Sequence, residues 1–207
     1  MLKRRLLSIL LVLAMLVPTA FASQPAQDNM RGVWVASVYN IDYPSNTGLS
    51  ADALAAEADT MLDNIAAMGL GTVFLQVRPS ADALYKSSLF PQSRYVSGAC
   101  GAAPDGDFDV LAYWVEGAHK RGLQLHAWVN PYRITKDGKD ELDALPESSP
   151  ARQHPEWVVQ YENNYYFDPG LPAVQQLVVD GAAEIVRNYD VDGIHLDDYF
   201  YPGTDFN

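Results

Sequence analysis

Two kinds of hydrophobic pattern alternate along this chain. Apolar runs typical of strands cover residues 32–42, 72–80, 123–133 and 191–199. Between them, apolar residues recur at helical spacing after Ser50, after Asp109 and from Pro172 to Asn188, and Gly69 and Gly122 end the first two segments. Ser50 and Asp109 are residues that cap helix N-termini well. Strands joined by single amphipathic helices predict an α/β fold with a parallel sheet and right-handed crossovers.

The loops of this predicted fold differ in length at the two ends of the sheet. The segments after the strands are long, and those before them are short. This asymmetry favours a TIM-type (β/α)8 barrel over a flat doubly wound sheet, because barrel enzymes carry their sites on the loops after the strands. A complete barrel needs eight strands in about 250 residues. We therefore expect residues 30–207 to be the N-terminal half of a barrel that contains about the first four strands.

Polar side chains gather on one face of three predicted strands. Successive residues of a strand point to opposite sides, so the apolar set of each strand packs on the helices and the mixed set points into the barrel. The first strand is apolar on both faces, and parity cannot place Trp34. For the other three strands the inward set is Gln76 and Arg78, then His126, Trp128 and Asn130, then His195 and Asp197. Three strands that bring polar groups together near their C-terminal ends predict a ligand site.

Each of these residues also has a structural interpretation. His126 and His195 can be hydrogen-bonded interior histidines, Arg78 can be an ion-pair partner, and Trp128 can fill the core. Taken one at a time, these interpretations are the better ones. The convergence of three strands in a single chain favours the site.

The adjacent acids Asp197 and Asp198 cannot serve as the two carboxylates of a glycosidase. Such carboxylates flank a sugar bond from opposite sides at about 5 to 10 Å, whereas neighbouring side chains diverge. Parity places Asp197 in the site, and we expect Asp198 to brace the rim. Aromatic residues near the strand ends, Tyr199 among them, offer rings on which the C–H faces of sugars stack, although several of them must be core residues.

The N-terminal residues are typical of an export signal. Lys3, Arg4 and Arg5 precede a largely apolar run over residues 6–17, and small residues at Ala20 and Ala22 suit a signal peptidase. We expect a signal peptide over residues 1–22, a linker over 23–29, no stable membrane insertion after cleavage, and a location outside the cell, in the cell envelope or in the periplasm. The run is shorter than the roughly 20 residues that span a bilayer, although an uncleaved anchor is the alternative.

The net charge, the cysteine content and the absence of certain motifs exclude several classes of partner and enzyme. The formal net charge is −12, which repels nucleic acid and anionic lipid surfaces and leaves neutral or cationic carbohydrates as suitable partners. The single cysteine, Cys100, has no partner for a disulfide within the chain. We find no Gly-X-Ser-X-Gly elbow, phosphate loop or dinucleotide fingerprint, and we expect no cofactor and no metal.

Five ordered segments resemble the bacterial glycosyl-hydrolase-like ten family, which includes glycoside hydrolases acting on peptidoglycan glycan strands stripped of their peptides. They are "RGVWVASVYNIDYPS", "FLQVRPSADALYKSSLFPQSRYVSG", "LHAWVNPYRI", "YYFDPG" and "VDGIHLDDYFYP". The resemblance covers residues 30–207 and implies a barrel related to the α-amylase-like glycosidases. In those enzymes a fourth-strand pattern of Gly, two residues, Leu and Asp carries the nucleophile, and here it matches Gly193, Leu196 and Asp197.

The resemblance also implies what the fragment lacks. His195 stands where amylase-like enzymes often have Arg, and their general acid follows a fifth strand, which would lie beyond Asn207. We therefore expect residues 30–207 alone to be inactive. The predicted function is hydrolysis of glycosidic bonds in bacterial cell-wall or related polysaccharide, with Asp197 as nucleophile or electrostatic stabiliser. The alternatives are a non-catalytic glycan-binding barrel and a metal-dependent hydrolase using His126, His195 and Asp197.

Overall fold

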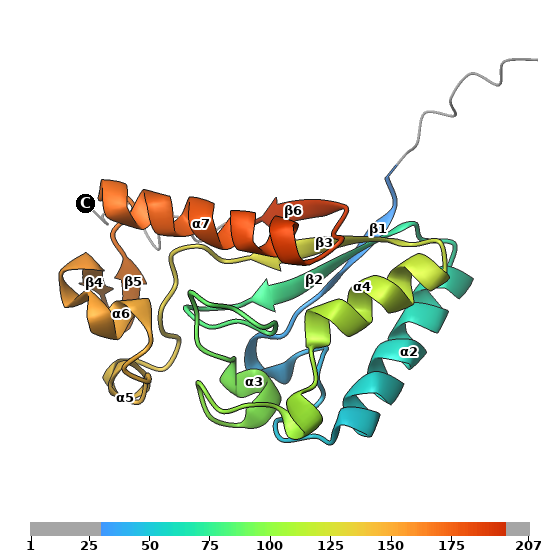
Figure 1. The fold of residues 1–207 in the computed structure, drawn as a ribbon, viewed down its shortest axis with the longest axis horizontal. Coiled ribbons are helices and arrows are strands. Elements are labelled where there is room, and N and C mark those ends of the chain that lie inside the picture. Colours follow the sequence, from blue (N-terminus) through green and yellow to red (C-terminus); the bar gives the residue numbers. More distant parts are fainter. Residues whose placement is uncertain (1–29, 198–207) are drawn as a thin grey trace, which may run out of the picture. The chain divides into compact units, whose positions relative to one another are not determined.

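A four-stranded parallel sheet forms the centre of the structure, a computed structural model that describes residues 30–197 (Figure 1). Its strands are β1 (Gly32–Val35), β2 (Thr72–Arg78), β3 (Gln124–Val129) and β6 (Gly193–Leu196), in the order β1-β2-β3-β6. All three strand pairs are parallel. Strands that follow one another along the chain, with helices between them, are therefore neighbours in the sheet, which confirms the predicted α/β fold.

Several predicted features lie outside the described residues. These are the export signal (1–22), the linker (23–29), and the two candidate site residues Asp198 and Tyr199. Within residues 30–197, no helix combines the length and the apolar character needed to cross a bilayer.

Three long helices connect the strands at the positions that the sequence predicts. They are α2 (Ala51–Ala67), α4 (Val110–Lys120) and α7 (Pro172–Asn188). The Ser50 side chain accepts a hydrogen bond from Ala53 N at 3.2 Å, and the Asp109 side chain accepts one from Ala112 N at 3.1 Å. Both predicted N-caps are thus confirmed, and each satisfies an amide that the helix itself leaves unpaired.

The main core lies between the sheet and helices α2 and α4, which run beside each other in Figure 1. Trp114 of α4 is fully buried and meets the ring of Tyr43 edge-on at 4.9 Å. Leu54 and Leu62 of α2 pack into the same core as Leu75 and Leu125 of the sheet. The residues that face this core are the apolar parity set of each strand, so the helices cover the face that parity assigns to them.

The long segment between β3 and α7 has a small structure of its own. It contains an antiparallel hairpin of β4 (Val158–Tyr161) and β5 (Asn164–Phe167), which the hydrophobic pattern does not predict. Ile134, Leu145, Phe167 and Val174 form a second core there. The remaining short elements are α3 (Arg94–Ser97), α5 (Lys139–Asp143), α6 (Pro150–Gln153) and the 3-10 turns Val38–Asn40, Asp105–Asp107 and Pro155–Trp157.

The first strand is much shorter than the predicted run over residues 32–42, because β1 ends at Val35. Tyr39 and Asn40 have φ angles of 56° and 52°, a left-handed backbone that cannot continue a strand. The amides of Ser37 and Val38 turn away from the sheet edge and donate to the side chain of Gln76. The strand therefore ends before the apolar run does, because the amides that follow it donate hydrogen bonds to the side chain of Gln76, a residue of β2.

A bulge in β2 changes the direction of Arg78. Gln76 pairs with Trp128, but the next partner, Val129, pairs with Arg78, so two residues of β2 oppose one of β3. Arg78 therefore points toward Gly181 of α7, and its guanidinium lies 4.1 Å from the centre of the ring of Phe90, a loop residue. Only 1% of Arg78 is exposed. The prediction that parity places Arg78 in the site is wrong, because one inserted residue reverses the alternation.

Replacing Gly181 by Ala tests this placement of Arg78. A Cβ at Gly181 of α7 would overlap Arg78 Nη1 and lie 3.0 Å from Phe90 Cε2. In an open helix, Gly→Ala adds roughly 1 kcal/mol of stability. Here we expect the reverse, a loss of about 1–3 kcal/mol from overpacking, measured by denaturant unfolding. A stabilised Gly181→Ala variant would contradict tight packing here and show that the Arg78 side chain moves away from α7 at little cost.

Candidate functional site at the carboxyl ends of the strands

A chain of hydrogen bonds crosses three strands on the inward face of the sheet. Gln76 of β2 is 1% exposed, and its Oε1 accepts hydrogen bonds from the amides of Ser37 and Val38, both at 3.0 Å. A side-chain amide has one acceptor oxygen and one donor nitrogen. Because two fixed backbone donors occupy Oε1, the Gln76 Nε2 must point the other way, where it donates to Asn130 Oδ1 at 2.6 Å.

Because its Oδ1 accepts the hydrogen bond from Gln76, Asn130 directs its Nδ2 toward Asp197. Asn130 follows β3, is 2% exposed, and donates from Nδ2 to Asp197 Oδ1 at 2.5 Å. Asp197 follows β6 in the same way. The backbone of the β1 loop thus fixes Gln76, Gln76 fixes Asn130, and Asn130 presents a donor to the carboxylate. A donor aimed at a carboxylate stabilises its charged form.

His195 lies beside this chain of hydrogen bonds in an aromatic cluster. Its Nε2 accepts a hydrogen bond from Trp34 Nε1 at 3.0 Å. Its ring centre lies 4.9 Å from that of Phe74 and 6.2 Å from that of Trp128. Trp128 Nε1 is buried and has no hydrogen-bond partner among the described residues. His195 and Trp128 therefore share the inward face with Asp197.

Trp34 is the member of the inward face that the sequence could not place. It pairs in register with Phe74 and stacks on its ring, with centres 4.8 Å apart and planes 17° from parallel. It is 54% exposed. An exposed tryptophan on the polar face of a sheet is a suitable surface for the C–H face of a sugar. Its position on the inward face follows from the pairing of β1 with β2, and the hydrophobic pattern of the sequence does not reveal this pairing.

His126 lies on the inward face but away from Asp197. It pairs with Gly193 at the start of β6, and its ring meets that of Phe74 at 5.1 Å. It precedes Asn130 by four residues, a distance of about 13 Å along a strand. A Cβ at Gly193 would come within 2.7 Å of the His126 ring, so this glycine is needed for the close packing of the two strands. The structure supports an interior role for His126 and does not bring it to the carboxylate.

Loops from three strand ends are joined at a second polar cluster. The hydroxyl of Tyr39, after β1, donates to Asp137 Oδ1 at 3.0 Å, and Arg94, after β2, donates from Nη2 to Asp137 Oδ2 at 3.0 Å. Burial and the adjacent Asp137 carboxylate raise the pKa of Tyr39 to about 12, so its hydroxyl keeps its proton. Asp137 follows β3. These contacts stabilise the left-handed turn at Tyr39.

The described histidines and acids do not assemble into a metal centre. Within residues 30–197, no three His, Cys, Asp or Glu side chains lie in a group that could hold a metal ion. His195 directs its Nε2 to Trp34, and His126 lies lower on the sheet. The donor set proposed for a metal-dependent hydrolase therefore does not converge on one point.

Comparison with known proteins places the chain in a family. Residues 29–207 match the family model described as Glycosyl hydrolase-like 10. The chain belongs to the glycosyl hydrolase-like 10 family. The resemblance drawn from the five sequence segments is thus confirmed, and Gln76, Asn130, His195 and Asp197 all lie within the matched region.

Two curated relatives support this membership. The chain is 43% identical over 199 residues to "Glycosyl hydrolase YngK" of Bacillus subtilis, a match that covers 96% of this chain and 38% of the relative. It is 36% identical over 207 residues to "Glycosyl hydrolase DigH" of Escherichia coli K12, covering 92% of this chain and 46% of the relative. The chain thus spans less than half the length of the curated relatives it matches.

The fold is similar to that of a solved glycosidase. A noncanonic maltogenic α-amylase, AmyB from Thermotoga neapolitana, superimposes with a TM-score of 0.53 over 85% of this chain and 41% of the amylase. The sequence identity is 18%, so this likeness concerns the fold alone. It agrees with a sheet that is built like part of an α/β barrel.

Proposed function

We propose that this chain carries the nucleophile side of a glycoside hydrolase active site, with Asp197 as the reacting carboxylate. The observation that supports it best is the chain of hydrogen bonds from the Ser37 and Val38 amides through Gln76 and Asn130 to Asp197. In this arrangement two buried amide side chains, those of Gln76 and Asn130, hold one carboxylate at the end of a parallel strand. Barrel enzymes carry their chemistry at that end of the sheet.

In the proposed reaction, Asp197 acts on the anomeric carbon of a bound sugar. As nucleophile it forms a bond to that carbon while the bond to the leaving oxygen breaks; as stabiliser it faces the positive charge that develops on the ring. Either role needs an ionised carboxylate, which the Asn130 donor favours. The leaving oxygen takes its proton from a second carboxylic acid, which we expect after a fifth strand by analogy with the amylase-like enzymes.

The aromatic part of the inward face supports a sugar as ligand. Trp34 is half-exposed, and Trp128 and His195 are partly exposed beside it. Such rings bind sugars by stacking while polar groups bind the hydroxyls. Arg78 has no part in this surface, because it is buried under α7. In this proposal Trp34, Trp128 and His195 bind the sugar, whereas the buried Gln76 and Asn130 hold Asp197 in position.

The substrate we propose is the glycan of the bacterial cell wall or a related polysaccharide, reached after export. The basic and apolar residues 1–22 support export, and a negative net charge suits a protein with no nucleic acid partner. The family to which the chain belongs is described as glycosyl hydrolase-like, and both curated relatives carry the name glycosyl hydrolase. We also propose that the four-stranded sheet is part of a closed eight-stranded barrel in the full-length protein.

Digestion of defined glycans by the full-length protein tests this function. We expect release of soluble oligosaccharides from peptide-free peptidoglycan strands, with less or none from intact peptidoglycan, and none from starch. Chromatography of the reducing-end products measures each. Sedimentation of the protein with the strands, without any cleavage, would instead indicate a glycan-binding barrel and would contradict the enzyme.

A further inference from the structure

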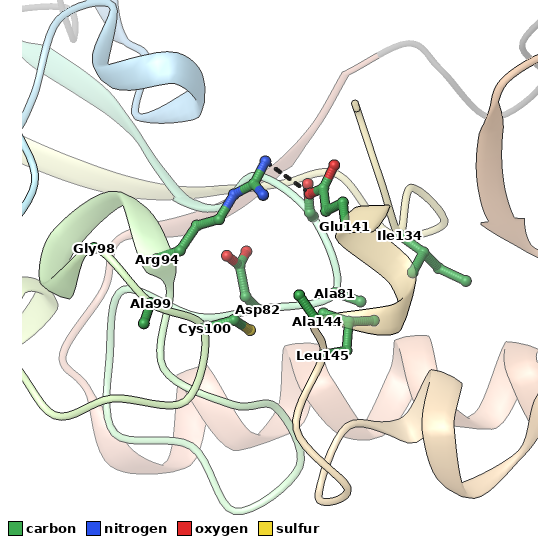
Figure 2. Close-up of a pocket in the computed structure, with 11 residues that line it drawn as sticks. Ala81, Asp82, Arg94, Gly98, Ala99, Cys100, Ile134, Glu141, Ala144 and Leu145 are labelled. Carbon is green, nitrogen blue, oxygen red and sulfur yellow. Dashed lines mark ion pairs between the residues drawn. The ribbon is translucent and has the colours of Figure 1, made fainter. Parts of the chain in front are cut away.

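A separate polar cavity lies in the loops after β2 and β3. It has a volume of about 250 Å³, and its wall comes from residues 80–82 after β2, from α3 and the turn that follows it, and from Ile134 and α5 after β3. Figure 2 shows the carboxylate of Asp82 pointing toward the side chains of Arg94 and Glu141. Asp197 and its hydrogen-bonding partners are not among the lining residues. This Asp82 cavity is therefore a site distinct from the one described above.

Asp82 is a buried carboxylate with unused hydrogen-bonding capacity. It is 4% exposed, and its Oδ2 accepts a hydrogen bond from Ser93 Oγ at 2.7 Å. Its Oδ1 has no hydrogen-bond partner among the described residues, and neither has the buried hydroxyl of Ser80, which lines the same cavity. Two buried oxygens without partners carry a considerable desolvation cost unless a ligand or solvent satisfies them.

The other charges of the cavity are already paired. Arg94 Nη2 lies 2.9 Å from Glu141 Oε1 and 3.0 Å from Asp137 Oδ2. The second Glu141 oxygen, Oε2, accepts the amides of Lys136 and Asp137 at 2.6 and 2.7 Å. Burial raises the pKa of the Cys100 thiol to about 12, so this side chain adds no charge. Asp82 is thus the carboxylate of the cavity that has no cationic side chain bonded to it.

We propose that the Asp82 cavity binds the protonated primary amine of a small ligand, of the class of an amino sugar with a free amino group. An ammonium group has three donors, and the cavity offers it Asp82 Oδ1 and Ser80 Oγ. The walls formed by Ala81, Ala144 and Leu145 suit the C–H face of a short carbon frame. The volume lies just below the roughly 300 Å³ at which pockets for drug-sized ligands begin, which limits the ligand to about one sugar ring.

The cavity fits other ligand classes less well. An anion would meet the Asp82 carboxylate, and the Arg94 guanidinium that could attract it is engaged by two acids. A divalent cation requires several anionic ligands, and no three His, Cys, Asp or Glu side chains form such a group within residues 30–197. An ammonium group needs one anion and neutral acceptors, which is what Asp82 and Ser80 provide.

Titration with a matched set of sugars tests the proposal. The full-length protein is titrated with glucosamine, N-acetylglucosamine and glucose at pH 7.5, and binding is followed by calorimetry and by the amide shifts of Ser80 and Asp82. The three sugars share one ring and differ in the amino group. We expect glucosamine to bind, the two uncharged sugars to bind at least about tenfold more weakly, and Asp82→Asn to weaken glucosamine binding by at least about tenfold.

Variants distinguish this cavity from the Asp197 site. Ser80→Ala removes only a hydroxyl and should weaken glucosamine binding, whereas Asp197→Asn should leave it unchanged and still abolish any glycan cleavage. The proposal is overturned if no sugar binds, if the three sugars bind alike, or if glucosamine binding depends on Asp197 and not on Asp82. The glucosamine titrations test the Asp82 cavity, whereas the loss of glycan cleavage in Asp197→Asn tests the hydrolytic site separately.

Stability provides a readout that is independent of ligand. Burial raises the pKa of Asp82 from its usual 3.8 to about 6, against the lowering effects of the Ser93 hydroxyl, the Arg94 charge and the Ser80 backbone amide, while Glu141 raises it further. The folded protein therefore holds an extra proton between about pH 4 and 6, and ionisation of Asp82 lowers stability as the pH rises through this window. We expect Asp82→Asn to raise Tm at pH 7.5 in the absence of ligand; a lowered Tm would show that Asp82 is a structural group.

Discussion

Under the proposed function, we expect replacement of Asp197 by Asn to lower kcat for glycan cleavage by at least about 10²–10³-fold, the scale on which loss of one transition-state contact acts. The substitution keeps the shape of the side chain, and Asn130 Nδ2 can still donate to its oxygen. It removes only the charge that the reaction needs. The rate is measured on peptide-free glycan strands with the full-length protein, and circular dichroism checks that the variant is folded.

Asp190→Asn is the matched control for this variant. Asp190 precedes β6 as Asp197 follows it, its side chain is 96% exposed, and it lies 3.9 Å from His119, away from the inward face. The same loss of one negative charge there should leave kcat within about twofold of the wild-type value, since exposed ion pairs contribute little. Equal activities of the two variants would remove Asp197 from the mechanism.

Under the proposed function, we expect replacement of Gln76, which does not contact the substrate, by Glu to lower kcat/KM by about 10- to 100-fold. A carboxylate at this position still accepts the amides of Ser37 and Val38, but it has no donor for Asn130 Oδ1. The Asn130 amide then turns its Nδ2 toward the new carboxylate and its oxygen toward Asp197. A hydrogen bond to a charged group contributes about 1.5–3 kcal/mol, which corresponds to this range of rates.

A pH profile separates this positioning role of Gln76 from a loss of stability. Loss of the donor and gain of a nearby negative charge both disfavour ionised Asp197, so the acidic limb of kcat/KM should move to higher pH. Gln124→Glu is the control, since Gln124 is an exposed residue at the opposite end of β3. A Gln76→Glu profile that is lowered but not shifted would mean that the hydrogen-bond chain does not act on Asp197.

The long elements of this fold were predictable because local signals mark them. Ser50 and Asp109 cap helices α2 and α4, and the apolar spacing of α7 predicts its bounds from Pro172 to Asn188. The strand alternation also placed Gln76, Asn130, His195 and Asp197 on one face, where hydrogen bonds and ring contacts now join them. Hydrophobic periodicity and helix capping depend only on residues close together in the sequence, so they can be recognised without knowing which other segments pack against them.

The features that the sequence did not predict depend on contacts between segments. The bulge that turns Arg78 under α7 arises from the register of β2 against β3, and the early end of β1 arises from Gln76 accepting the amides of the following loop. Trp34 takes its place on the inward face from its pairing with Phe74. The Asp82 cavity joins loops from two different strands. Each of these contacts joins two segments that lie apart in the sequence, so neither segment shows a periodic pattern that would reveal it.

If a sugar bond reacts at Asp197, a crystal structure of the full-length Asp197→Asn variant with a peptide-free glycan oligosaccharide should show the reacting sugar beside this residue. We expect a sugar ring at the carboxyl ends of β3 and β6, with its anomeric carbon about 3–3.5 Å from the side chain at position 197, as a near-attack geometry requires. An oligosaccharide bound elsewhere, with no anomeric carbon within reach of this position, would contradict the assignment.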